Sequence, residues 1–315
     1  MNKTKKVSRK IIALVLSIVM ILSIVPMSAS AAEAIKKGLT TDKEVNFAVM
    51  SDMHYYPASL AGNYNEAFME STKTALAREP YQSVGILESA LAGIAEHAKE
   101  NGMKYLVLSG DLTSNGEYEA HRQLAARLEK FEKDTGIQVI AINGNHDINK
   151  ANGTTYENGK AEPTKRTSPE DFLEIYKNLG YDLAYHRYTP SKGKANMLSY
   201  SVRADGYRFI VMDTGKYSSD VTEKGKDLAE TSGCLTTEAT NWVLNEIADA
   251  KANGETVIGV SHHNFVPHFT GEYTIIRGFV IDGWEELTDK LVDAGMHFSF
   301  TGHIHDSDIA RTVTD

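Results

Sequence analysis

Cysteine is almost absent from the 315-residue sequence, in which Cys234 is the only one. The chain therefore cannot form an internal disulfide bond, and its stability must come from a hydrophobic core. About 280 residues remain once a short leader is set aside, which is ample for such a core. Cys234 lies in no motif of a reactive thiol, and we expect it to be a small, buried or half-buried side chain.

Long apolar stretches are also scarce. The one that stands out, Ile11 to Val25, is shorter than the roughly 20 residues of a membrane-spanning helix. It ends at Pro26, small residues follow at Ala29-Ser30-Ala31, and a basic segment precedes it with Lys3, Lys5, Lys6, Arg9 and Lys10. This order is typical of a secretory signal peptide. We expect residues 1–31 to be cleaved near Ala31, which leaves a secreted chain without a stable membrane anchor; an uncleaved anchor is the less favoured alternative.

Positive charge is in short supply in the expected mature chain. Five of the 33 lysines and arginines lie in the leader, so 28 remain against 42 acidic residues, a net charge of −14. A surface that wraps a nucleic-acid duplex needs clustered cations to displace counterions from the phosphates. The composition therefore argues against a nucleic-acid duplex as a partner.

Short apolar runs alternate with helical periodicity along the rest of the chain. Five runs are typical of buried strands: Val45 to Met50, Tyr105 to Leu108, Val139 to Ile142, Val257 to Val260 and His297 to Phe300. Apolar positions at helical spacing predict helices around Leu87 to Ala98, Leu124 to Phe131, Phe172 to Leu179, Thr237 to Ile247 and Trp284 to Leu291. This alternation predicts an α/β fold with mixed sheets covered by helices.

Two further patterns concern the connections. Met197 to Arg203 and Tyr207 to Asp213 predict a β-hairpin that turns at Asp205-Gly206. Two long stretches, Tyr55 to Gln82 and Ala151 to Lys165, fit no regular element well, and stretches of this length are usually functional. Both follow a polar strand end, so we expect both to rim the same edge of the sheet.

Each of the five expected strands ends in a polar motif that contains aspartate, asparagine or histidine. The motifs are Ser51-Asp52-Met53-His54, Ser109-Gly110-Asp111, Gly144-Asn145-His146-Asp147, Ser261-His262-His263-Asn264 and Thr301-Gly302-His303-Ile304-His305. In α/β folds, strand ends carry catalytic and ligand residues on loops that a rigid sheet holds. Any one motif alone is more often a turn or a cap, but all five in order are difficult to obtain by chance.

The residue types in these motifs are those of a transition-metal site. Side chains alternate along a strand with period two, so Asp52 and His54, like His303 and His305, are expected on one face. Asp111 has two carboxylate oxygens and can bridge two ions. Imidazole together with carboxylate favours first-row transition metals over calcium or magnesium. Two such ions roughly 3.5–4 Å apart can activate water and steady the oxygens of a displacement at phosphorus.

Together the motifs resemble those of the calcineurin-like metallophosphoesterases, whose ordered set is Asp-Xaa-His, Gly-Asp, Gly-Asn-His-Asp/Glu, His and Gly-His-Xaa-His. Every member of the set is present, and the match runs from Val45 to the end of the chain. The resemblance implies an αββα sandwich of two mixed β-sheets flanked by helices, with a dinuclear metal site at the C-terminal edge of the strands. The domain would cover residues 32–315.

The resemblance also implies roles for nine residues. One ion would be held by Asp52, His54, Asp111 and His305. The other would be held by Asp111, Asn145, His262 and His303. Both would be divalent transition-metal ions such as manganese, iron or zinc, and a hydroxide bridging them would attack the phosphoester substrate. The catalytic residues would be His146, as the acid or charge stabiliser at the leaving-group oxygen, and Asp147, which steadies its loop.

Three segments bear on the branch of the family. Purple acid phosphatases carry a tyrosine three residues after the bridging aspartate, where this chain has Ser114. The sequence GDLTSNG from Gly110, with SHHNFVPH from Ser261 and GHIHDSDI from Gly302, is similar to class III cyclic-nucleotide phosphodiesterases and related exported bacterial enzymes. The leading hypothesis is therefore an exported hydrolase of phosphoric esters, with a diester favoured over a monoester.

Two other functions are compatible with the motifs. A DNA-processing nuclease shares Gly-Asn-His-Asp, but export and the negative charge oppose it. A non-catalytic surface or binding module on the same fold is the other alternative, although such proteins usually lose a ligand and this chain keeps all of them. Family members usually continue beyond Gly-His-Xaa-His, whereas this sequence stops at Asp315, which suggests a fragment that lacks C-terminal strands.

Several other histidines and tyrosines lie near the motifs, and we do not expect them to bind metal. We expect His121 on a helix surface or at a cap, and His263 bonded to nearby backbone rather than to metal. His268, in a loop at the expected site, is a candidate for substrate contact. The tyrosines of the first long stretch are expected to pack within it rather than on a ligand: Tyr55, Tyr56, Tyr64 and Tyr81.

Overall fold

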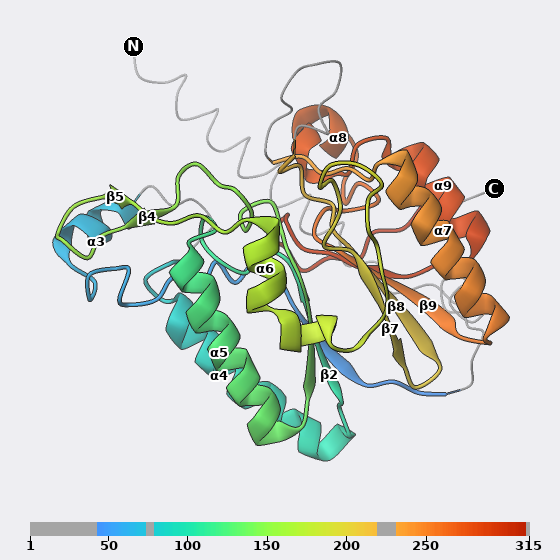
Figure 1. Cartoon of the computed structure of the whole chain (residues 1–315), viewed down its shortest axis with the longest axis horizontal. Helices are drawn as coiled ribbons and strands as arrows, with labels where there is room; N and C mark the ends of the chain where they lie inside the picture. The colour runs from blue at the N-terminus through green and yellow to red at the C-terminus, as the bar shows by residue number, and fades with distance from the viewer. Residues whose placement is uncertain (1–42, 74–78, 219–230, 313–315) are drawn as a thin grey trace, which may run out of the picture. The chain divides into compact units, whose positions relative to one another are not determined.

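Two β-sheets lie at the centre of the chain in the computed structural model, which describes residues 43–73, 79–218 and 231–312 (Figure 1). These residues belong to one unit, Thr40–Asp315, and the expected signal peptide, residues 1–31, lies outside them. No helix within the three described ranges is long and apolar enough to cross a lipid bilayer. Export and cleavage of the leader therefore stay predictions.

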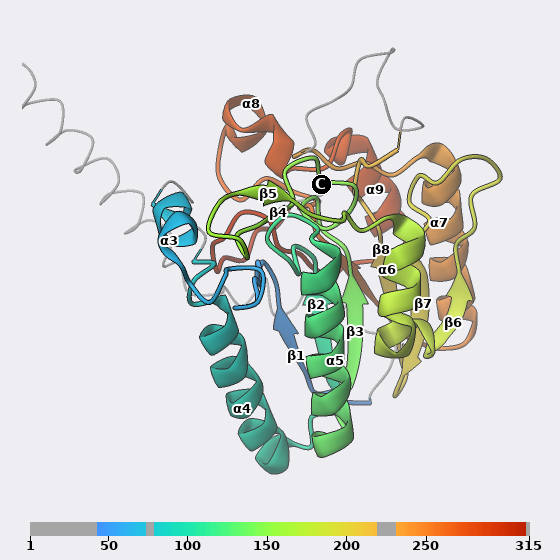
Figure 2. The same ribbon diagram turned by 60° about the vertical axis from the view of Figure 1, so that its left-hand side comes forward.

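The first sheet contains three parallel strands in the order β1-β2-β3. Their bounds are β1 Phe47–Met50, β2 Tyr105–Ser109 and β3 Gln138–Ile142. Parallel neighbours need a crossover connection, and helices α4 (Ser83–Asn101) and α5 (Tyr118–Thr135) supply it. Both helices cover the same face of the sheet (Figure 2). Strand β2 is consequently buried along its whole length, as expected of a central parallel strand.

The second sheet has five strands in the order β10-β9-β8-β7-β6. Their bounds are β6 Ala184–Arg187, β7 Tyr200–Ala204, β8 Tyr207–Met212, β9 Thr256–Ser261 and β10 Ser299–Phe300. Strand β7 pairs antiparallel with β6 and β8, whereas β8, β9 and β10 run parallel. The predicted hairpin is β7-β8, and it turns at Asp205 and Gly206 with the positive φ angles that two-residue hairpin turns require.

The two sheets pack face to face, which confirms the predicted αββα sandwich (Figure 1). Helices α7 (Thr237–Ala252) and α9 (Trp284–Ala294) cover the outer face of the second sheet. Between the sheets, Leu108 and Ile140 share one core with Phe209.

All five predicted strands are confirmed to within two residues at each end. The first sheet is parallel throughout, so only the second is mixed, because α4 and α5 provide both crossovers of the first.

One predicted helix is shorter than its periodicity indicates. Helix α6 covers Pro169–Ile175, and a π-helical turn, Lys177–Tyr181, replaces its last expected turn. Gly180 has a φ of 111°, and a Cβ atom there would lie 2.3 Å from the hydroxyl oxygen of Tyr200. The backbone leaves the helix near Gly180 because Tyr200 packs against it there. This tertiary contact overrides the helical periodicity of the local sequence.

The two long stretches contain short regular elements that the sequence did not indicate. The first holds helix α3 (Glu66–Thr72), and the second a ribbon of β4 (Thr154–Thr155) and β5 (Glu162–Pro163). The Tyr56 hydroxyl donates to the Thr154 carbonyl at 2.6 Å, which joins the two stretches. Tyr56 also stacks on Phe68 with ring centroids 5.2 Å apart, so its predicted packing within the stretch is confirmed.

Tyr200 offers a test of how the sheets are held together. Its fully buried hydroxyl on β7 donates to the Ala141 carbonyl on β3 at 2.8 Å. Tyr200→Phe should lower the free energy of unfolding by about 0.5–1.5 kcal/mol, because one buried hydrogen bond is lost. Denaturant titration measures this change, with the exposed Tyr64→Phe as the matched control. An equal effect of both substitutions would contradict the assigned contact.

Candidate metal centre

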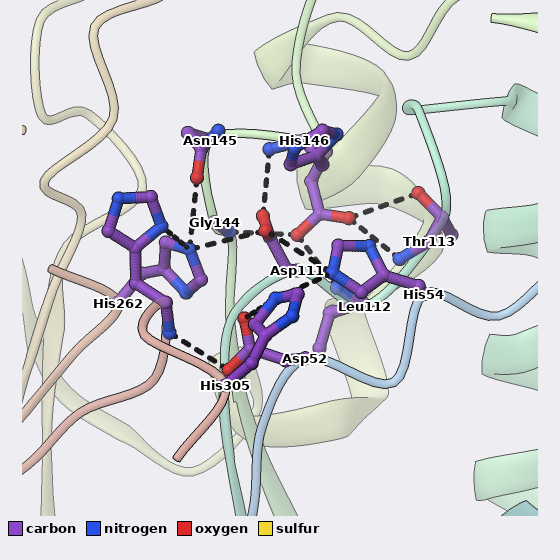
Figure 3. Close-up of polar contacts among 12 residues, drawn as sticks. Asp52, His54, Asp111, Leu112, Thr113, Gly144, Asn145, His146, His262 and His305 are labelled. Atoms are coloured by element: carbon purple, nitrogen blue, oxygen red, sulfur yellow. Dashed lines mark hydrogen bonds and ion pairs between the residues drawn. The ribbon is translucent and has the colours of Figure 1, made fainter. Parts of the chain in front are cut away.

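The C-terminal ends of β1, β2, β3, β9 and β10 meet at one edge of the sandwich, and the loops that leave them carry all nine predicted site residues. Figure 3 labels seven of the nine, all except Asp147 and His303. Hydrogen bonds between loops hold this edge together. The His303 N–H donates to Asp52 Oδ2 at 2.9 Å. The ring of His262, from the second sheet, donates through Nδ1 to the Ser109 carbonyl of the first sheet at 3.0 Å. The site thus lies across the junction of both sheets.

Most of the predicted metal ligands have a left-handed backbone. Positive φ angles between 41° and 79° occur at five of the seven: Asp52, His54, Asp111, His303 and His305. Such conformations are unfavourable for residues other than glycine, and they persist where the surrounding structure compensates for the strain, commonly at functional sites. We predicted that Asp52 and His54, and likewise His303 and His305, share one face because side chains alternate along a strand. That reason is wrong, because these residues lie beyond the strand ends. Their side chains converge because the backbone reverses there.

A first group of potential ligand atoms comprises Asp52, His54, Asp111 and His305, all within 4.8 Å of one another. The Nε2 atoms of His54 and His305 are 3.1 Å apart. His305 Nε2 lies 3.2 Å from Asp52 Oδ1, and His54 Nε2 lies 3.8 Å from Asp111 Oδ2. These four residues are the set that the resemblance assigned to one ion.

A second group comprises Asp111, His262 and His303, again within 4.8 Å. His262 Nε2 is at its centre, 3.3 Å from Asp111 Oδ2, 3.1 Å from His303 Nδ1 and 3.1 Å from Asn145 Oδ1. The four residues of the second predicted set are therefore together as well. Asp111 belongs to both groups, and its Oδ2 faces one ring of each, His54 and His262.

Backbone carbonyls determine which nitrogen of each ring faces the second group. His262 Nδ1 lies 3.0 Å from the Ser109 oxygen, and His303 Nε2 lies 3.1 Å from the Gly278 oxygen. Each of these nitrogens carries the proton that it donates, so in the neutral rings the other nitrogen holds a lone pair. The lone pairs of His262 Nε2 and His303 Nδ1 face each other with only acceptor oxygens beside them. Such a donor set fits a bound cation.

The charges at this edge lead to the same conclusion. Although burial opposes its charged form, the Asp111 carboxylate raises the pKa of His262 to about 9, so without an ion the ring holds a proton at Nε2 that a bound divalent cation would displace. Burial and the neighbouring His262 lower the pKa of His303 to about 4. The carboxylates of Asp52 and Asp111 therefore draw positive charge to the site, and divalent cations provide it when bound.

Two glycines allow the backbone to approach two of the predicted ligands closely. A Cβ atom on Gly144 would lie 2.2 Å from Asp111 Oδ1, and one on Gly110, where φ is 90°, would lie 2.6 Å from His262 Nδ1. Any side chain at these positions would displace a predicted ligand.

His146 lies beside both groups without belonging to either. Its backbone N–H donates to Asp111 Oδ1 at 2.7 Å, and its ring meets the His54 ring edge-on with centroids 5.2 Å apart. Nδ1 of His146 faces Asn115 Oδ1 at 3.1 Å. Asn115 lies within the GDLTSNG segment, but no sequence pattern marks it as a site residue.

Asp147 is fully buried and binds two loops together. Its carboxylate accepts N–H groups of Leu112, Thr113 and Gly144 at 2.8–3.0 Å, and the Thr113 hydroxyl at 3.0 Å. The loop after β2 and the loop after β3 are thereby fixed to one another. Asp147 is in neither group of potential metal ligands.

His121 corrects the sequence analysis, which expected a surface or cap position. It is fully buried, with Nδ1 2.8 Å from the Tyr176 hydroxyl and Nε2 3.0 Å from the Thr113 hydroxyl. Burial lowers the pKa of His121 to about 3, so the ring is neutral. Helical spacing could have indicated this, because His121 precedes the buried Leu124 and Leu128 by three and seven residues.

Two further histidines border the site. His263 is bonded as expected, with Nε2 donating to the Thr231 carbonyl at 3.1 Å and Nδ1 2.8 Å from the Thr214 hydroxyl. His268 Nδ1 lies 3.2 Å from Asp308 Oδ2. Its contact with substrate stays a prediction.

The family model described as calcineurin-like phosphoesterase matches residues 45–307. No curated protein sequence matches significantly. Among solved structures, a dimetal phosphatase from Danio rerio is 13% identical with a TM-score of 0.51, over 83% of this chain and 82% of that one, which shows a shared fold. A purple acid phosphatase from yellow lupin (Lupinus luteus) seeds is 12% identical with a TM-score of 0.43, over 85% of this chain and 39% of that one.

Asp111 should be required for binding at both positions. We expect roughly two divalent ions per wild-type chain, and loss of most of the metal in Asp111→Ala, because both groups lose their shared ligand. Metal analysis after dialysis measures this content. Asp134→Ala, at an exposed carboxylate of α5 paired with Lys130, is the control and should retain both ions. Loss of a single ion in Asp111→Ala would show that the carboxylate is not shared.

Gly110 tests the close approach to His262. Gly110→Ala and Gly136→Ala both place a side chain at positive φ, but a Cβ atom meets His262 at Gly110 and open space at Gly136. We expect a loss in metal affinity of at least about tenfold for Gly110→Ala and little change for Gly136→Ala. Competition with a fluorescent chelator measures both affinities. Equal affinities would show that the His262 ring can move aside.

Proposed function

The chain belongs to the calcineurin-like phosphoesterase family, and from that premise we propose that it is an exported, metal-dependent phosphodiesterase. As a member of this family it is a hydrolase of phosphoric esters with a dinuclear divalent metal centre. The proposal adds three things to this: the residues of the centre, the kind of ester, and the location outside the cytoplasm.

One observation supports the assignment of residues, namely the convergence of seven side chains from five strand ends into two groups that share Asp111. Asp52, His54 and His305 complete the first group, and Asn145, His262 and His303 the second. Two divalent ions held there would activate a water molecule and neutralise charge on the phosphoryl oxygens. The remaining tasks fall to the protein itself: orienting the ester and handling the proton of the leaving group.

His146 is suited to the second task, because it lies beside Asp111 and is not itself in a ligand group. In the hydrolysis, the oxygen of water bonds to phosphorus and the bond from phosphorus to the leaving oxygen breaks. His146 donates its proton to that oxygen and regains one from the water that is consumed. Asp147 keeps the His146 loop in register with the loop of Asp111 through the bonds described above.

Charge favours a diester. The five strand-end segments, residues 51–56, 109–117, 143–150, 261–268 and 301–308, contain one lysine or arginine, Lys150, and its side chain is buried. A monoester dianion brings one more negative charge than a diester, and these segments offer no exposed cation to offset it. Export rests on the leader, residues 1–31, whose pattern is typical of a signal peptide.

Hydrolysis of nitrophenyl esters by residues 32–315 tests this function. With added manganese, we expect a higher kcat/KM for the phosphodiester than for the matching monoester. Chelator should abolish turnover, and Asp111→Ala should reduce it by at least about 100-fold.

Each contrary result has a distinct meaning. Preference for the monoester would contradict the charge argument, and turnover that survives chelator would contradict the metal centre. A folded, metal-loaded protein without turnover on either ester would instead favour a binding module on this fold.

A further inference from the structure

Asn115 makes a contact that connects it to the proposed leaving-group chemistry. Its side-chain oxygen Oδ1 lies 3.1 Å from His146 Nδ1, and the same oxygen accepts Nδ2 of Asn152 at 3.1 Å. An amide oxygen accepts and does not donate, so the His146 nitrogen that faces it is the one that carries a proton. Two donors on one oxygen also fix the orientation of the amide group.

The backbone around Asn115 is held firmly. Its N–H donates to the Glu117 carboxylate at 2.9 Å, and Glu117 is fully buried. The next residue, Gly116, has a φ of 67°, and a Cβ atom there would lie 2.7 Å from the Asp147 carbonyl oxygen and 3.1 Å from that of His146. The segment with Asn115 therefore packs directly on the backbone of the residue that it contacts.

Resting on the function proposed above, we propose that Asn115 is the positioning residue for His146. By accepting Nδ1–H, it sets the rotation of the imidazole and its tautomer. In the imidazolium, Nε2 on the opposite side of the ring carries the second proton, which passes to the leaving oxygen, and the ring that remains is the neutral Nδ1–H tautomer. Displacement of a catalytic group by about 1 Å can lower the reaction rate on the order of 100-fold. Loss of the contact that orients this ring should therefore appear as a lower rate.

The amide of Asn115 differs from a carboxylate in its effect on the charge of the His146 ring. A carboxylate in the same place would also orient the ring, but it would in addition attract positive charge to it. Asn115 is neutral and orients without that attraction. The contact with Asn152 extends the same link to the second long stretch, residues 151–165.

Leaving groups of different basicity separate positioning from a general structural role. Nitrophenolate leaves without a proton, whereas an alkoxide must be protonated as it departs. In the manganese-loaded enzyme, we expect Asn115→Ala to lower kcat for an alkyl-leaving diester by about 10- to 100-fold. The loss for a nitrophenyl diester should be small. Asn115→Asp, which keeps an acceptor oxygen, should retain most of the activity on the alkyl ester.

A double-mutant cycle assigns the effect to His146. If Asn115 acts through the ring, Asn115→Ala should cause no further loss in a His146→Ala background. Asn158→Ala is the matched control, because Asn158 lies in the same stretch as Asn152 and donates to the half-buried Glu162 at 2.7 Å in a solvent-exposed hydrogen bond. This control should behave as wild type with both esters.

Nitrogen NMR of the imidazole rings in the zinc-loaded protein gives a readout apart from turnover. His146 should be protonated at Nδ1 in the wild type and in Asn115→Asp, and should be a mixture of tautomers in Asn115→Ala. A metal-loaded, folded Asn115→Ala whose losses are equal for both esters, or whose His146 tautomer is unchanged, would overturn the proposal. If His146→Ala shows no preference between leaving groups, the acid role of His146 itself is wrong, and that failure is separate from a failure of Asn115.

Discussion

The structure depends on a buried carboxylate that several groups share. Asp111 Oδ2 faces His54 and His262 from two different strand ends, while Oδ1 accepts the N–H of His146. His262 Nε2 and His303 Nδ1 are acceptors in the neutral rings, because the other nitrogen of each ring donates to the carbonyl of Ser109 or Gly278. Positive charge placed among these buried acceptors therefore stabilises the cluster. The remainder of the fold, with two sheets that end at one edge, brings these acceptors together and keeps them in place.

Holding them requires a backbone that local preferences disfavour. Asp52, Asp111 and His303 adopt left-handed conformations, and Gly110 and Gly144 leave no room for a side chain beside the ligands. The compensation comes from neighbouring elements, above all from Asp147, which binds four donors of the adjoining loops, and from the core between the sheets. The strain is therefore local, and the rigid parts of the molecule support it.

The sequence predicted the strands, and it named the residues that the structure brings together at the sheet edge, because both depend on short-range patterns. Apolar runs followed at once by Asp, Asn or His are visible without a fold, and the resemblance placed each ligand in its set. What the sequence could not show depends on contacts between distant residues. The end of α6 is determined by Tyr200 beside Gly180. His121 can be buried because both nitrogens of its neutral ring have hydrogen-bond partners, the hydroxyls of Thr113 and Tyr176. The role proposed for Asn115 likewise depends on its contact with His146, which comes from another strand end.

Anomalous scattering from crystals soaked in manganese tests the central claim, that one carboxylate is shared by two ions. The account predicts two peaks roughly 3.5–4 Å apart with Asp111 between them. Asp52, His54 and His305 should surround one peak, and Asn145, His262 and His303 the other. A single peak, or a pair that Asp111 does not bridge, would contradict the account, because the convergence of the five strand ends would then have another cause.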